Sequence, residues 1–279
     1  MLYLGYLAAR LATALLPRNA AYLVATWVAG VWWFLSPAVR RNLDRNLALI
    51  PALRDSRALR TAVAHRTVRN FAVAVTDFLR LPRLNAANLD QVVAVEDFHE
   101  IKRLLADRPA VLVTAHLGNW EIAAAGAALV GIDLSVIVWD HPDPRVAAIF
   151  RRRREAKGLK VMSVRGAARS MPAVVGTSSI ALAGDRDFTG QGMPASFLGA
   201  PTTVPHAYAA LASSRGIPVI PVFCLRLGDG RYHLFREPPL TPRPAADDAE
   251  FIVDRVLRAA EKYVEKYPEQ WYRFDSLGK

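Results

Sequence analysis

The sequence has one cysteine, a shortage of acidic residues and no apolar run of the usual membrane-spanning length. Cys224 is the only cysteine among 279 residues, which excludes an internal disulfide. It lies in the apolar run Ile217 to Leu225, where a thiol is typically a small buried hydrophobe. The six histidines do not combine with it into a zinc-site spacing, so we predict no metal. The absence of internal repeats and of a long low-complexity linker favours one large α/β domain.

Acidic residues are outnumbered by basic ones. The chain has 25 Asp and Glu against 36 Lys and Arg, which gives a formal net charge of +11. A surface of this charge suits an anionic partner, either membrane phospholipid or nucleic acid. No nucleic-acid recognition motif occurs, and the tryptophan-rich apolar start suits a bilayer better. We therefore predict anionic membrane lipids as partners and no nucleic acid; the sequence defines no oligomeric state.

The longest apolar run is Ala20 to Leu35, which has 16 residues and contains three tryptophans. A membrane-spanning helix usually needs about 20 residues, so the run is a short or tilted span, a re-entrant helix or an interfacial helix. We predict membrane-associating helices over residues 1–36 and an α/β domain over residues 37–279. A signal peptide is the alternative, but the run lies late and is bracketed by prolines. A buried helix of a soluble domain is another alternative, because 16 residues also suit a core helix.

Arginines are more frequent after this run than before it. Arg10 and Arg18 precede it, whereas Arg40, Arg41 and Arg45 follow it. If the segment spans, this bias places the rest of the chain on the cytoplasmic side. We therefore predict a location at the cytoplasmic (inner) membrane with the α/β domain facing the cytoplasm.

The remaining chain alternates between helical and β-rich segments. Residues Ser56 to Arg80 have helical spacing of apolar residues, with Ser56 as a cap and Pro82 as the stop. A last helix is expected over Asp247 to Tyr267. The alternation predicts an α/β fold with a largely parallel central sheet flanked by helices. The expected strands are Val92 to Val95, Ala110 to Ala115, Leu134 to Val138, Ser179 to Ala183 and Ile217 to Leu225.

Two polar residues follow predicted strands directly. His116 comes after one strand and Asp185 after another. Ligands of open α/β sheets bind outside the carboxyl ends of the strands, so these side chains are expected at one edge of the sheet. The alternative for Asp185 and its neighbours Arg186 and Asp187 is a solvated loop with local salt bridges, and the role of Asp187 stays open.

The segment VLVTAHLGNWE combines a strand, a turn and the start of a helix. Gly118 eases the turn and Asn119 is a plausible helix cap. Four residues separate His116 from Glu121, so we expect Glu121 to accept a hydrogen bond from the imidazole and fix its tautomer. His116 can then take a proton from an alcohol. The spacing alone also fits the alternative of a capping histidine that only hydrogen-bonds the turn.

Several motifs resemble one family. HLGNWE is similar to the His, four residues, acid signature of lipid acyltransferases, in the His-x-x-Asn-Trp-Glu form of the lipid A late acyltransferases and phosphatidylinositol mannoside acyltransferases. Further similar blocks follow in the family's order. They are RRNLDRNLALIP from Arg40, Arg154 with Gly158, LAGDRDFTGQGMPASFLGAP, IPVIPV from Ile217 and PEQWYRF from Pro268.

The resemblance implies roles for individual residues. His116 is expected to be the general base and Glu121 its partner, with Arg154 and Asp185 binding substrate. A guanidinium at position 154 suits a phosphate, and Asp185 suits acceptor hydroxyls or Arg154 itself. Trp139, Phe188, Phe197 and Leu198 are candidates for lining an acyl-chain channel, with core packing as the alternative.

The resemblance also implies the reaction. We expect a membrane-associated acyltransferase that moves a fatty acyl group from acyl carrier protein or acyl coenzyme A to a hydroxyl of a glycolipid or phospholipid, without a cofactor. The chain lacks the Phe-Pro-Glu-Gly-Thr block of glycerol-phosphate acyltransferases, and PHAYAALA lacks the Gly-Pro of the lipid A branch. The alternatives are a glycerophospholipid or ornithine-lipid acyltransferase and a basic, non-catalytic lipid-binding protein.

Overall fold

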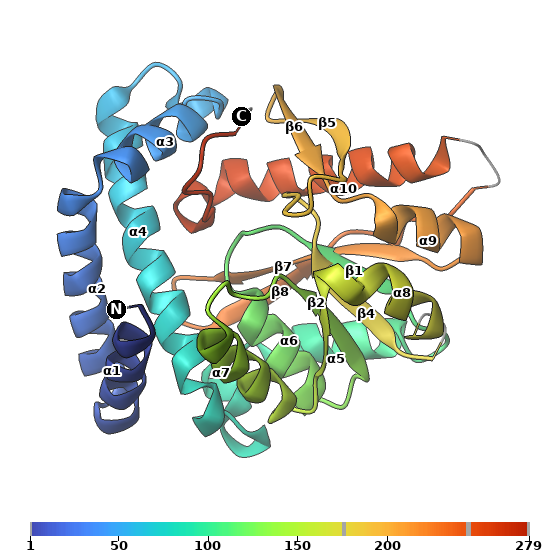
Figure 1. Cartoon of the computed structure of the whole chain (residues 1–279), viewed down its shortest axis with the longest axis horizontal. Helices are drawn as coiled ribbons and strands as arrows, with labels where there is room; N and C mark the ends of the chain where they lie inside the picture. The colour runs from blue at the N-terminus through green and yellow to red at the C-terminus, as the bar shows by residue number, and fades with distance from the viewer. Residues whose placement is uncertain (1, 175–176, 244–246, 278–279) are drawn as a thin grey trace.

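A six-stranded sheet lies at the centre of the molecule, with helices on both of its faces and a further group of helices beside it (Figure 1). The computed structural model describes residues 2–174, 177–243 and 247–277. Helices α9 (Ala207–Arg215) and α10 (Asp248–Lys266) cover one face of the sheet, and α5 (Val95–Leu104) and α6 (Trp120–Leu129) cover the other. The predicted α/β fold is confirmed.

The sheet has the order β3-β2-β4-β1-β7-β8. All neighbouring pairs are parallel except β7 and β8, which are antiparallel at one edge. The prediction of a largely parallel sheet is therefore confirmed, and buried apolar runs such as that of β7 are typical of strands covered on both faces. The strands are β1 (Val111–Thr114), β2 (Leu134–Val138), β3 (Lys160–Ser163), β4 (Ser179–Ala183), β7 (Val219–Arg226) and β8 (Tyr232–Arg236).

The first quarter of the chain forms four helices beside the sheet. They are α1 (Leu2–Leu15), α2 (Arg18–Leu35), α3 (Pro37–Leu47) and α4 (Arg57–Arg80). Helix α4 is the longest, and α1 and α2 both pack against it. The predicted helix start is confirmed, because the Ser56 side chain accepts a hydrogen bond from the backbone N–H of Leu59.

Of the remaining helices, α7 (Pro144–Glu155) connects β2 with β3 and α8 (Val164–Val174) connects β3 with β4. The short 3-10 helices lie outside the strand connections, and they are η1 (Pro51–Leu53), η2 (Leu81–Arg83), η3 (Ala86–Gln91) and η4 (Pro268–Gln270). The helix expected over residues 247–267 is confirmed as α10.

One predicted strand is wrong. Residues Val92 to Val95 follow η3 and lead into α5, and only Val93 makes an isolated bridge, with Tyr232. These apolar residues fill the core beneath α5 and do not form a ladder. The predicted strands do not include the hairpin of β5 (Met193–Phe197) and β6 (Ala200–Val204), which lies between β4 and α9.

The N-terminal helices expose an apolar surface. No single helix within the described part of the chain is long and apolar enough to cross a membrane; α2 and α3 meet the length and composition criteria only together, and they are bent by 93°. The exposed apolar side chains of α1 and α2 are Leu4, Leu11, Leu15, Leu23, Val24, Trp27, Val28, Val31, Phe34 and Leu35. We call this set the N-terminal apolar face.

Candidate active site

The strand register brings His116 and Asp185 together. Strands β1 and β4 are parallel neighbours in which Thr114 lies opposite Ala183, so the residues two positions further on, His116 and Asp185, also meet. His116 Nδ1 and Asp185 Oδ1 are 2.8 Å apart. Asp185 is 2% exposed, whereas the His116 side chain is 19% exposed. The prediction that these residues converge at the carboxyl edge of the sheet is confirmed.

The backbone after His116 is held from two sides. The N–H of Asn119 donates to the carbonyl of Cys224 on β7 at 2.8 Å, and the N–H of Gly118 donates to the carbonyl of Gln270 at 2.9 Å. Gly118 has φ +66°, and a Cβ there would lie 2.0 Å from the Cys224 oxygen. The turn therefore requires glycine, both for its left-handed conformation and for the close approach to β7.

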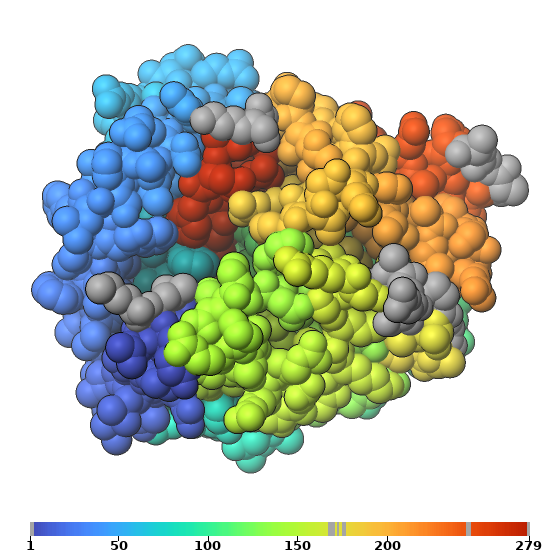
Figure 2. Space-filling model, in the orientation of Figure 1, coloured from blue at the N-terminus to red at the C-terminus, as the bar shows by residue number. Residues whose placement is uncertain are grey.

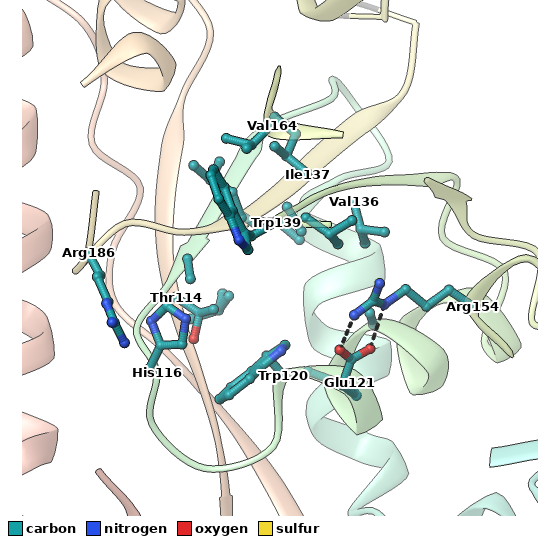
Figure 3. Close-up of a pocket in the computed structure, with 18 of the residues that line it drawn as sticks. Thr114, His116, Trp120, Glu121, Val136, Ile137, Trp139, Arg154, Val164 and Arg186 are labelled. Atoms are coloured by element: carbon teal, nitrogen blue, oxygen red, sulfur yellow. Dashed lines mark hydrogen bonds and ion pairs between the residues drawn. The ribbon is translucent and has the colours of Figure 1, made fainter. Parts of the chain in front are cut away.

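Glu121 does not pair with His116, contrary to the prediction. It makes a bidentate ion pair with Arg154, in which Nε lies 2.9 Å from Oε2 and Nη2 lies 2.5 Å from Oε1. Figure 3 shows Glu121 turned toward Arg154, with Trp120 between it and His116. The reason is local: the chain reverses at Gly118 and α6 begins only at Trp120, so the two residues do not share a helical turn.

The charges of these groups follow from their surroundings. Burial opposes the ionisation of Asp185, but His116 and the nearby Arg273 outweigh it and hold the pKa of this carboxyl below its usual value. Burial also opposes the charge of Arg154, yet Glu121 keeps the pKa of the guanidinium raised. Burial raises the pKa of the Cys224 thiol, which favours its protonated form.

An apolar cavity of about 360 Å³ opens beside His116. It extends between α6 and the sheet, and its walls include Leu112 of β1, Val136 of β2, Ala181 of β4 and the α6 alanines 123, 124 and 127. Charged side chains also line the cavity, and Figure 3 shows His116 and Arg186 on one side of Trp120 and the Glu121–Arg154 pair on the other.

Two of the four suggested channel residues line this cavity. Trp139 and Phe188 stack with ring centroids 5.3 Å apart, and Phe188 also packs edge-on against the His116 ring. Phe197 instead lies in the main core against Trp271, so the alternative of core packing applies to it. Leu198 packs against the same core at the β5–β6 turn.

The C-terminal segment is a part of the site that sequence reasoning missed. The N–H of Tyr272 donates to the carbonyl of His116 at 2.8 Å, and Arg273 Nη1 donates to the carbonyl of Asp185 at 3.2 Å. The buried Asn46 side chain of α3 in turn donates to the carbonyls of Arg273 and Asp275. The two blocks RRNLDRNLALIP and PEQWYRF thus meet in space. In the sequence, their occurrence in the same family pattern was the one signal that both could belong to the site.

The open question of Asp187 is answered by its contacts. Its carboxylate accepts hydrogen bonds from Thr189 and from the backbone N–H of Gly192. Asp187 therefore organises its own loop and also lines the cavity. Arg186 lines the cavity too, and it pairs with Asp275 at 3.1 Å. No group of three His, Cys, Asp or Glu side chains within the described residues is arranged to hold a metal ion.

Comparison with known protein families assigns the chain. The family described as bacterial lipid A biosynthesis acyltransferase matches residues 1–277. The chain belongs to this acyltransferase family. A phosphatidylinositol mannoside acyltransferase of Mycolicibacterium smegmatis is 28% identical over 198 residues, which cover 69% of this chain and 64% of that protein. One of Mycobacterium tuberculosis is 25% identical over 244 residues, which cover 84% of this chain and 74% of that protein.

The ion pair of Glu121 with Arg154 yields a stability prediction for this family member. Both side chains are nearly buried, with exposed fractions of 14% and 10%. Glu121→Gln leaves the guanidinium without its counter-charge, and we expect a loss of about 2–4 kcal/mol in the free energy of unfolding. Arg154→Gln should cost a similar amount. The double variant should recover much of the loss, because neither charge is then buried alone.

Chemical unfolding of the three variants measures this effect. A Glu121→Gln variant that keeps wild-type stability, or a double variant whose loss equals the sum of the single losses, contradicts the structural role of the pair.

Proposed function

We propose that this protein transfers a fatty acyl group from an acyl thioester to a hydroxyl of a glycolipid. The observation that carries the proposal is the His116–Asp185 pair, whose imidazole lines an apolar cavity. The pair supplies a base for a hydroxyl, and the cavity supplies a dry environment for a hydrocarbon chain. Family membership supports the same reaction class.

In the proposed reaction, Asp185 accepts the hydrogen bond from His116 Nδ1–H and so leaves Nε2 as the basic nitrogen. Nε2 takes the proton of the acceptor hydroxyl while its oxygen attacks the thioester carbonyl carbon. The tetrahedral adduct then collapses, the carbon–sulfur bond breaks, and the leaving sulfur takes the proton from the imidazolium. The products are an ester and a free thiol.

This assignment moves the partner of the base from Glu121 to Asp185. The carboxylate at 2.8 Å stabilises the imidazolium that forms during the transfer, and its lowered pKa keeps it charged. In this proposal Glu121 and Arg154 form a wall of the site, and they are not the partner of the base and the phosphate ligand that the sequence predicted. Arg186 lines the cavity near His116 and is the guanidinium that we assign to the anionic part of donor or acceptor.

For the acceptor we propose a hydroxyl of a phosphoglycolipid. The named relatives are acyltransferases of phosphatidylinositol mannoside, a lipid with both sugar hydroxyls and a phosphate. The net charge of +11 suits such an anionic acceptor. For the donor we propose a thioester of acyl carrier protein or coenzyme A, since a thioester is already activated and needs no enzyme nucleophile.

We further propose that the N-terminal apolar face rests on the cytoplasmic membrane. Trp27 is 71% and Phe34 77% exposed. Together with the other side chains of this face they form an apolar surface that is unusual for a protein in water. An apolar groove of about 570 Å³ separates α1, α2 and α4 on the same part of the molecule. Tyr6 of α1 packs against Phe150, which lines the acyl cavity. Helix α1 therefore adjoins the cavity, and Figure 2 shows a recess between these helices and the green segments.

The catalytic pair yields the first functional prediction. His116→Ala should lower turnover by roughly 10²–10⁴, and Asp185→Asn by at least about tenfold, because the base and its orienting charge are lost. Transfer of labelled acyl groups from both thioester donors to membrane lipid extract, followed by lipid mass spectrometry, measures this.

The surface residue His233 provides the matched control. His233 lies on β8, and its Nε2 is 3.0 Å from an Asp229 carboxylate oxygen. His233→Ala should therefore keep full turnover. A folded His116→Ala variant with wild-type turnover refutes the assignment. A wild type that binds lipid vesicles but labels no lipid favours the non-catalytic lipid-binding alternative.

The α6 wall of the cavity predicts chain-length selectivity. Ala124→Leu should fill part of the cavity and move the preferred donor to a shorter chain, with kcat/KM for the longest accepted chain falling roughly 10- to 200-fold per methylene that no longer fits. Ala128→Leu makes the same change on the same helix outside the cavity lining and should leave the preference unchanged. An unchanged preference in Ala124→Leu excludes this cavity as the acyl site.

The N-terminal apolar face predicts vesicle binding. The double variant Trp27→Ser with Phe34→Ser should weaken binding to anionic phospholipid vesicles at least about tenfold, since each buried aromatic contributes about 1.5–3 kcal/mol. Leu59→Ser is the control, because Leu59 is 53% exposed on α4 outside this face. Vesicle sedimentation measures the binding, and equal binding of all three proteins contradicts the proposed membrane contact.

A further inference from the structure

A buried chain of polar side chains connects α2, α4 and β8 with the turn after His116. Asp77 of α4, 5% exposed, accepts hydrogen bonds from the hydroxyls of Tyr22 at 2.6 Å and Tyr232 at 2.8 Å. Asn119 Nδ2 lies 3.2 Å from the Tyr232 hydroxyl oxygen, to which it donates. Arg18 Nε donates to the Tyr22 hydroxyl at 2.7 Å. Four elements of the fold are thus joined through one carboxylate.

Asn119 uses its whole side chain in this arrangement. Its Oδ1 accepts from the N–H of Ile122 and caps α6, while Nδ2 donates to the carbonyl of Ala74 and to Tyr232. The residue lies between His116 and Glu121 in the sequence. Its orientation therefore fixes where the loop that carries His116 ends and where α6 begins.

The Tyr232 hydroxyl is held firmly enough to orient Asn119. Hydrogen bonds to a carboxylate are shorter and stronger than neutral ones, and this one lies in the protein interior. Burial and the Asp77 charge raise the pKa of Tyr232, so the hydroxyl keeps its proton and stays a donor to Asp77. Its lone pair is then directed to Asn119. Buried polar groups of this kind cost desolvation, which apolar side chains in the same places would avoid.

We propose that Tyr232, anchored on Asp77, is a positioning residue that holds the turn from His116 to Glu121 through Asn119. Its effect on turnover rests on the proposed acyltransferase function. Its effect on the turn does not, because backbone protection is measured without substrate.

Amide hydrogen exchange tests the positioning directly. In Tyr232→Phe, the N–H groups of Gly118, Asn119 and Ile122 should exchange roughly three- to tenfold faster, as expected for one lost hydrogen bond. Tyr263→Phe is the matched control. It removes a hydroxyl of α10 that donates to Glu237 at 2.9 Å, and it should leave amide exchange in the turn unchanged. Unchanged exchange of the turn in Tyr232→Phe overturns the proposal.

A double-mutant cycle in turnover separates positioning from general stabilisation. Asn119→Ser keeps a helix-capping hydroxyl but loses the amide that bonds Tyr232. Each single variant should lower kcat roughly tenfold with KM for the thioester nearly unchanged, because misplaced groups affect the reaction more than binding. The double variant should be no slower than Asn119→Ser alone. Losses that multiply overturn the proposal, since independent sites add in free energy.

Two further results keep the test decisive. If Tyr232→Phe does not fold, Asn119→Ser carries the same exchange measurement, and normal exchange of Gly118 and Asn119 N–H groups in that variant overturns the proposal. If the wild type transfers no acyl group, the proposed function fails, while faster exchange in Tyr232→Phe still supports the positioning of the turn.

Discussion

The hydrogen bond between His116 and Asp185 depends on one constraint, the parallel register of β1 and β4. Because Thr114 and Ala183 are register partners, strands β1 and β4 end at the same level of the sheet. The side chains of His116 and Asp185 then meet, with Nδ1 and Oδ1 2.8 Å apart. Gly184 allows this closeness, since a Cβ there would lie 2.6 Å from Val113. A slip of either strand by one residue would turn one of the two side chains to the other face of the sheet. The site is thus a consequence of sheet geometry more than of local sequence.

The N-terminal helices and the C-terminal segment support this pair from outside the sheet. Asn46 of α3 binds the carbonyls of Arg273 and Asp275, and the same segment reaches His116 and Asp185 through Tyr272 and Arg273. The first helices are therefore linked to His116 and the turn after it by two sets of hydrogen bonds, this one and the chain through Asp77. In the proposed function, the helices that we place on the membrane are thus joined by hydrogen bonds to the residues around the proposed base.

Sequence patterns predicted the framework better than the pairings within it. The apolar runs of β1, β2, β4 and β7 located the central strands, and strand ends placed His116 and Asp185 on one edge. The short distance in sequence made Glu121 the expected partner of His116, but partners within a turn depend on backbone direction, and the φ of +66° at Gly118 reverses the chain. Arg273 lies 88 residues beyond Asp185 in the sequence, and no local periodicity connects the two. Their contact is therefore visible only in the folded chain.

The ion pair of Glu121 with Arg154 has a consequence for the cavity that an imidazole partner would not have. A lone carboxylate or guanidinium beside an apolar cavity would bind water and draw it toward the hydrocarbon chain. The bidentate pair satisfies both groups at 2.5 and 2.9 Å and leaves no net charge at this wall. In the proposed reaction, the acid of the His-x-x-Asn-Trp-Glu motif therefore helps to keep the acyl site dry, while the acid that acts on the base comes from another strand.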